Sequence, residues 1–105
     1  MQLNNLIIFL KGKPYHYRLK LKNTALHSEW SSWLIQPSES YLETANDGSV
    51  ALSTVESIVI NAVEIKQQGK LIAPKMIDHT AIVIKYLNQE AISFIAMDNY
   101  LLITL

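Results

Sequence analysis

Polar and apolar residues alternate strictly along residues 15–22 of the chain. Because successive side chains of a strand point to opposite faces, this period of two predicts a half-buried strand with a cationic outer face. The inward set is Tyr15, Tyr17, Leu19 and Leu21, and the outward set is His16, Arg18, Lys20 and Lys22.

Three short polar segments that contain glycine predict hairpins, since glycine adopts the positive φ angles of tight turns at little cost. Residues 11–14 separate 3–10 from 15–22, residues 46–49 separate 41–45 from 50–52, and residues 68–69 separate 63–67 from 70–73. Each flanking segment is therefore expected to be a strand.

The last third of the sequence consists of apolar runs that polar residues interrupt. The runs cover residues 80–87, 91–97 and 100–105, and the interruptions are residues 88–90 and 98–99. Short apolar runs between polar turns favour strands near the middle of a sheet.

Two segments allow more than one interpretation. Residues 53–56 resemble a helix capping box and apolar residues recur at helical spacing up to residue 63, but the many β-branched residues of 53–66 favour strand, which we predict. In residues 27–36, Trp30, Trp33 and Leu34 predict either a short helix that ends before Pro37 or a loop that runs into a strand.

These patterns predict a predominantly antiparallel β fold of about seven or eight short strands, in a meander or a small sandwich. The alternative is an α+β fold with one helix near residues 53–66. With 105 residues, the chain is expected to form a single domain, 1–105.

Three features that the sequence lacks bear on the location of the protein. Residues 1–10 carry no Lys or Arg before their short apolar run, and no stretch approaches the roughly 20 apolar residues of a membrane span. The chain contains no cysteine, which excludes disulfides and agrees with a reducing compartment. We therefore expect a cytoplasmic protein that does not associate with membranes.

Catalytic and cofactor-binding motifs are absent from the sequence. His16, His27 and His79 lie in separate segments without the spacing of metal ligands, and Asp78 and His79 are neighbours that would point apart in a strand. The serines form no nucleophile elbow and the glycines no phosphate-binding loop. We expect neither an enzyme, nor a metal site, nor a cofactor.

The charges are segregated along the chain although the formal net charge is zero. Residues 1–22 hold Lys and Arg without an acid, whereas residues 23–64 hold acids without Lys or Arg. The basic hairpin 11–22 could follow a phosphate backbone, but its tyrosines point away from its cations, and the zero net charge disfavours a nucleic-acid binder. A solvated outer face of an edge hairpin explains these lysines as well.

The acidic middle segment is the candidate binding surface, because Tyr and Trp are enriched at interface hot spots and acids steer a basic partner. The predicted partner-binding residues are Glu29, Trp30, Trp33, Glu39, Tyr41, Glu43 and Asp47. The alternative is that the tryptophans anchor the core and the acids pair with the basic segment of the same chain.

The functional hypothesis is thus a non-catalytic protein-binding domain. Its most concrete form is an immunity-type inhibitor that neutralises a basic, nuclease-like bacterial toxin by blocking its active site. Its alternative is a small RNA- or DNA-associated module that uses the hairpin 11–22. A third hypothesis is self-association through an edge strand at residues 100–105.

Overall fold

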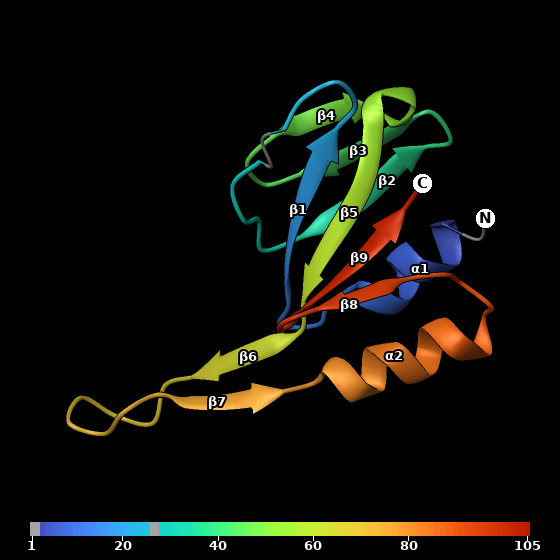
Figure 1. Ribbon diagram of the computed structural model, residues 1–105. Helices are drawn as coiled ribbons and strands as arrows, with labels where there is room; N and C mark the ends of the chain where they lie inside the picture. The colour runs from blue at the N-terminus through green and yellow to red at the C-terminus, as the bar shows by residue number, and fades with distance from the viewer. Residues whose placement is uncertain (1–2, 26–27) are drawn as a thin grey trace.

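The computed structural model describes residues 3–25 and 28–105, which contain nine strands, two α-helices and one 3-10 turn (Figure 1). In chain order they are α1 (Leu3–Leu10), β1 (His16–Leu21), β2 (Leu34–Ser38), β3 (Tyr41–Thr44), β4 (Gly48–Ala51), η1 (Leu52–Thr54), β5 (Val55–Asn61), β6 (Val63–Lys66), β7 (Lys75–Asp78), α2 (Thr80–Gln89), β8 (Ile95–Met97) and β9 (Tyr100–Thr104). His27, one of the three predicted histidines, lies outside the described residues.

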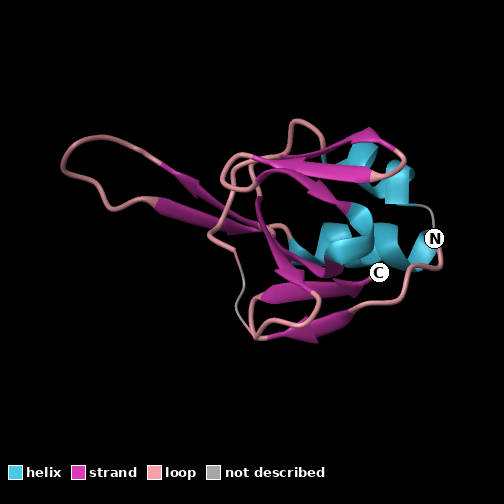
Figure 2. Cartoon of the chain, turned by 90° about the horizontal axis from the view of Figure 1, so that it is seen from above, coloured by secondary structure: helices cyan, strands magenta, loops and turns pink. Residues whose placement is uncertain are grey.

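All strand pairs are antiparallel, so the predicted predominantly antiparallel β class is confirmed. A four-stranded main sheet has the order β1-β5-β9-β8, and a second sheet has the order β2-β3-β4. The strands β6 and β7 form a ribbon of their own, which leaves the body of the molecule (Figure 1). Seen from above, the helices lie toward the end of the molecule opposite the tip of this ribbon (Figure 2).

The core lies on one face of the main sheet, where the inward residues of its long strands meet the helices and the second sheet. Alternation places Leu19, Ile58 and Ile103 side by side in register, and each is at most 1% exposed. The buried partners from the other elements are Leu6 and Leu10 of α1, Leu34 and Leu42 of the second sheet, and Val83 and Leu87 of α2.

The prediction of a strand over residues 3–10 was wrong, because this segment is α1. Its buried residues Leu3, Leu6, Ile7 and Leu10 follow the i, i+3, i+4, i+7 spacing of one helix face. The segment 11–14 is therefore a helix–strand connection, with Gly12 at φ +76°. The expected hairpin 11–22 does not exist.

Residues 80–87 were also predicted as a strand and instead belong to α2. Val83 and Leu87, one helical turn apart, are its buried residues, while Ile82 on another side is exposed. Of the predicted strand 91–97, only β8 at Ile95–Met97 is formed. The described residues form nine strands, one more than the upper end of the expected seven or eight.

The helix near residues 53–66 that the α+β alternative required is absent from the structure. Residues 55–61 form β5, which lies between β1 and β9 and satisfies its backbone on both sides. The described part of 27–36 is a loop that runs into β2, with Ser31 bridging to Tyr17. The β-branched composition thus outweighed the capping-box signal.

The hairpin over residues 41–52 is confirmed by β3 and β4, with Gly48 at φ +65° directly after its turn, at the start of β4. The third hairpin exists, but its second strand is β7 at Lys75–Asp78 and not 70–73, so its turn is longer than predicted.

The C-terminal strand β9 has a neighbour on each side and offers no free edge for self-association. Within the described ranges, neither helix is long and apolar enough to span a bilayer.

Candidate protein-binding surface

The outer face of the β2-β3-β4 sheet carries exposed apolar side chains around one carboxylate. Register pairs Ile35 with Glu43, and alternation along β3 puts Tyr41 on the same side as Glu43, away from buried Leu42. Trp33 lies two residues before Ile35 and therefore belongs to this side. We call Trp33, Ile35, Tyr41 and Glu43 the acidic aromatic face.

This face differs from an ordinary solvated sheet face, which carries polar residues. The exposed fractions are 41% for Trp33, 39% for Ile35 and 47% for Tyr41. The Ser49 hydroxyl of the next strand donates a hydrogen bond of 3.1 Å to Glu43 Oε1, which orients the carboxylate. Exposed aromatic groups around an oriented charge are typical of a protein interface.

Three of the predicted residues, Trp33, Tyr41 and Glu43, are thus brought together. Ile35 was missed, although it lies two residues from Trp33 and the alternation of a strand would have found it. Glu39 is exposed in the turn between β2 and β3. Asp47 lies in the turn between β3 and β4 at the other end of β3, where it accepts a hydrogen bond of 2.8 Å from the Thr44 hydroxyl.

Glu29 and Trp30 lie elsewhere, beside the main sheet. The Trp30 ring lies 4.4 Å from the Arg18 guanidinium carbon and 5.1 Å from the Tyr100 ring centre. Arg18 and Tyr100 project from the outer face of the main sheet, where Val59 is 2% exposed and separate from the main core. Trp30 therefore stabilises that face through stacking and cation–π contact.

Three cations of the basic segment 11–22 have partners within the chain. Lys20 forms an ion pair with Glu56, Arg18 stacks on Trp30, and the Lys13 ammonium lies 4.5 Å from the Phe9 ring centre. Lys11 and Lys13 also line a hollow of about 70 Å³ beside Trp33 and Ile35, so they border the acidic aromatic face on its β2 side.

A larger open cleft of about 700 Å³ lies at the other end of the second sheet. Glu39, Gln36 and the C-terminal Leu105 are among its lining residues. Gln36 Oε1 is buried and has no hydrogen-bond partner in the structure. Among residues 3–25 and 28–105, no three His, Cys, Asp or Glu side chains gather as metal ligands would.

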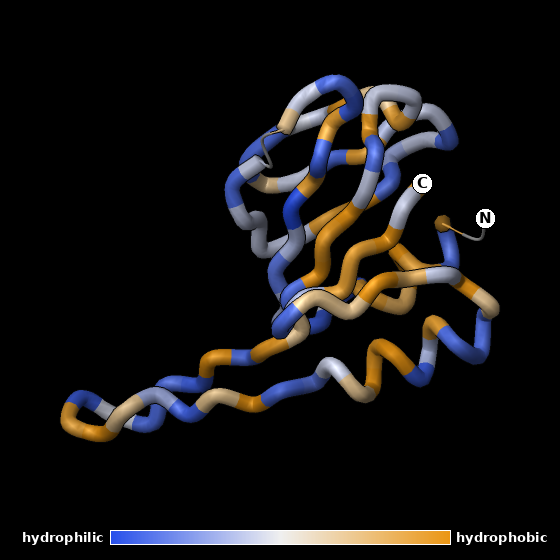
Figure 3. Tube along the Cα trace, viewed as in Figure 1, coloured by the Kyte–Doolittle hydropathy of each residue, from blue (hydrophilic) through white to orange (hydrophobic). Residues whose placement is uncertain are grey.

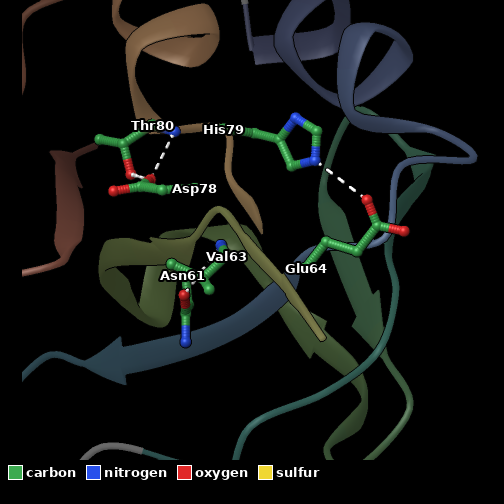
Figure 4. Close-up of polar contacts among 6 residues, drawn as sticks. All are labelled: Asn61, Val63, Glu64, Asp78, His79 and Thr80. Carbon is green, nitrogen blue, oxygen red and sulfur yellow. Dashed lines mark hydrogen bonds and ion pairs between the residues drawn. The ribbon is translucent and has the colours of Figure 1, made fainter. Parts of the chain in front are cut away.

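The junction between the body and the β6-β7 ribbon holds the remaining polar cluster (Figure 4). The ring atom His79 Nε2 lies 3.0 Å from Glu64 Oε1. The backbone N–H of His79 donates a hydrogen bond of 2.8 Å to the Ala62 carbonyl. Asp78 turns away from His79 and accepts a hydrogen bond of 2.9 Å from the Thr80 N–H at the start of α2. These contacts fix the direction of the ribbon and the first turn of α2, and Asp78 and His79 do not form an acid–base pair.

The contacts of Asp78 predict a pH dependence of stability. The Thr80 hydroxyl, followed by the Thr80 N–H, donates to the carboxylate and lowers the pKa of Asp78 below its ordinary value of 3.8. A group whose pKa is lower in the folded than in the unfolded state stabilises the fold at pH values above its unfolded pKa. This stabilisation is lost as the pH falls through the folded pKa. We expect Asp78→Ala to destabilise the protein at about pH 7, with the difference from wild type shrinking below pH 3.8.

Urea unfolding at a series of pH values measures this difference. Thr80→Val removes the hydroxyl donor alone and is expected to reproduce part of the effect with the same pH dependence. A difference between Asp78→Ala and wild type that stayed constant down to strongly acidic pH would contradict the proposed cause.

Comparison with known proteins identifies a family but no function. Residues 2–104 match the family described as "Family of unknown function (DUF6678)". No curated protein and no solved structure matches the chain.

Proposed function

Because the chain belongs to this family of unknown function, we propose a function from its own surface: a non-catalytic protein-binding domain that docks its acidic aromatic face on a basic protein. The observation that carries the proposal is the convergence of Trp33, Ile35 and Tyr41, all exposed, around Glu43. Large aromatic anchors around a fixed charge supply binding energy and orientation together.

The finer form of the proposal is an immunity-type inhibitor that covers the active site of a basic, nuclease-like toxin. Residues 33–51 carry Glu39, Glu43 and Asp47 and no Lys or Arg, so this sheet complements a cationic surface. The small size of the chain and its lack of catalytic motifs agree with an inhibitor. Cytoplasmic location is part of this proposal, because an immunity protein protects the cell that produces it.

The alternative, a nucleic-acid module on residues 11–22, receives less support from the geometry. The expected hairpin is replaced by a helix–strand connection, and its cations Lys13, Arg18 and Lys20 contact Phe9, Trp30 and Glu56. A phosphate backbone would have to compete with these contacts.

Capture from native lysate with the tagged full-length chain tests the proposal. We expect a basic protein to be retained in stoichiometric amount and released by salt, and we expect Trp33→Ala or Glu43→Lys to weaken its binding by about 30-fold, the effect of a 2 kcal/mol hot spot. The matched controls are Ile82→Ala and Glu90→Lys, which change an exposed apolar residue and an acid in or next to α2.

The identity of the captured material and the pattern of the variants decide the outcome. Equal loss in the face variants and the α2 controls would refute the assignment of the surface. Retained material that is nuclease-sensitive and insensitive to Trp33→Ala would favour the nucleic-acid alternative.

A further inference from the structure

The β6-β7 ribbon and its tip, residues 63–78, form an arm that projects from the body (Figure 1). Four of its large apolar residues are exposed: Ile65 by 59%, Leu71 by 100%, Ile72 by 57% and Met76 by 68%. Register pairs Ile65 with Met76, so both lie on one face of the ribbon and lead to the apolar tip. The tube coloured by hydropathy shows this apolar tip set between hydrophilic segments (Figure 3).

The outer part of the arm, residues 65–77, carries positive charges only, whereas Glu64 and Asp78 lie at its base. Residues 65–77 contain Lys66, Lys70 and Lys75 and no acid. Lys66 and Lys75 are directly opposite each other in the ribbon, and like charges in this position are destabilising. A two-stranded ribbon is also marginally stable in water by itself. An acidic surface with apolar groups would neutralise the lysines and cover the exposed side chains.

The acidic aromatic face has these properties. It presents Trp33, Ile35 and Tyr41, and its sheet carries three acids and no base over residues 33–51. Its acids lie on β3 and on the turns at either end of β3. In the chain itself the arm points away from the β2-β3-β4 sheet, so the two surfaces meet only between copies (Figure 1).

We propose that the arm of one copy docks on the acidic aromatic face of a second copy. Three lysines and four apolar residues of the arm then meet Glu43 and three apolar residues of the face, with Glu39 and Asp47 in the adjoining turns. If each copy supplies both surfaces, the exchange closes into a two-fold dimer. This inference rests on the proposed function, because it uses the same acidic aromatic face. The second copy and the basic protein would compete for that face.

Sedimentation velocity of the full chain tests the exchange by charge reversal. We expect wild type to sediment as a dimer of twice the 11.9 kDa chain mass, with a dissociation constant that rises as salt is added. An arm-reversed variant (Lys66→Glu, Lys70→Glu, Lys75→Glu) and a face-reversed variant (Glu39→Lys, Glu43→Lys) are each expected to be monomers. Their equimolar mixture is expected to restore the dimer, because both contacts between unlike variants are then complementary.

The control is the pair Lys85→Glu and Glu90→Lys, whose sites are the exposed face and the C-cap of α2, and it is expected to leave the dimer unchanged. Leu71→Asp provides a second test that leaves all lysines in place, and it is expected to weaken the dimer about tenfold or more. A wild-type chain that stays monomeric at every concentration, or a mixture that fails to dimerise while both variants are folded by circular dichroism, would overturn the proposal.

The arm-reversed variant separates this inference from the proposed function. It keeps the acidic aromatic face, so it is expected to retain the basic protein in the capture experiment although it no longer forms dimers. Dimers without any captured protein would refute the proposed function alone, and captured protein without dimers would refute the exchange alone.

Discussion

Replacing Ile58 with alanine is expected to lower the free energy of unfolding by about 2–5 kcal/mol, the range for removing buried methyl and methylene groups. Ile58 has no exposed surface and lies in the middle of β5, between Leu19 of β1 and Ile103 of β9. All three side chains are buried, so little can move to fill the space that alanine would leave. Urea denaturation gives the change in the unfolding free energy.

The matched control is Ile95→Ala in β8, which removes the same atoms from a side chain that is 55% exposed. We expect its effect to stay within about 0.5 kcal/mol. Similar losses from the two variants would mean that the core does not lie on the assigned face of the main sheet.

Replacing Lys85 with proline is expected to cost about 3 kcal/mol or more. Lys85 lies in the interior of α2, where proline removes a backbone hydrogen bond and its ring clashes with the carbonyl four residues earlier. Its side chain is exposed, so little packing is lost and the effect reports on the backbone. At about 4–8 °C per kcal/mol, we expect a fall in Tm of about 12 °C or more by thermal unfolding.

A graded series at this position makes the test specific for a helix. Lys85→Ala is expected to be near neutral, and Lys85→Gly to cost about 1 kcal/mol more than alanine. A proline variant as stable as the alanine variant would contradict a helix at this position.

Composition predicted part of the candidate binding surface. The segment that holds Glu29 through Asp47 was selected for its acids and aromatic residues, and the fold keeps Trp33, Tyr41 and Glu43 on one face. Trp30, only three residues before Trp33, stacks on Arg18 and Tyr100 beside the other sheet. Two tryptophans of one loop thus have different surroundings because the chain passes from the edge of β1 into β2 between them.

The helices show where local patterns fail. Residues 3–10 and 80–87 are short apolar runs, and such runs suit a buried strand as well as one face of a helix. Leu6 and Val83 are buried in the core from helices, while β1, β5, β9 and β8 form the main sheet. The choice therefore depended on which segments occupied the sheet.

The sequence by itself determined the half-buried strand β1 up to Lys20, the hairpin of β3 and β4 and the antiparallel β class, since alternation and turn glycines act between near neighbours in the chain. Leu21, predicted to point inward, is 37% exposed because the register of β1 against β5 shifts between Lys20 and Leu21. Only the tertiary structure decided that residues 3–10 and 80–89 are helices, that residues 63–78 project as an arm, and that Trp30 and Trp33 are separated. These outcomes depend on which segments compete for the same sheet edges and core surface, and that competition takes place between residues far apart in the sequence.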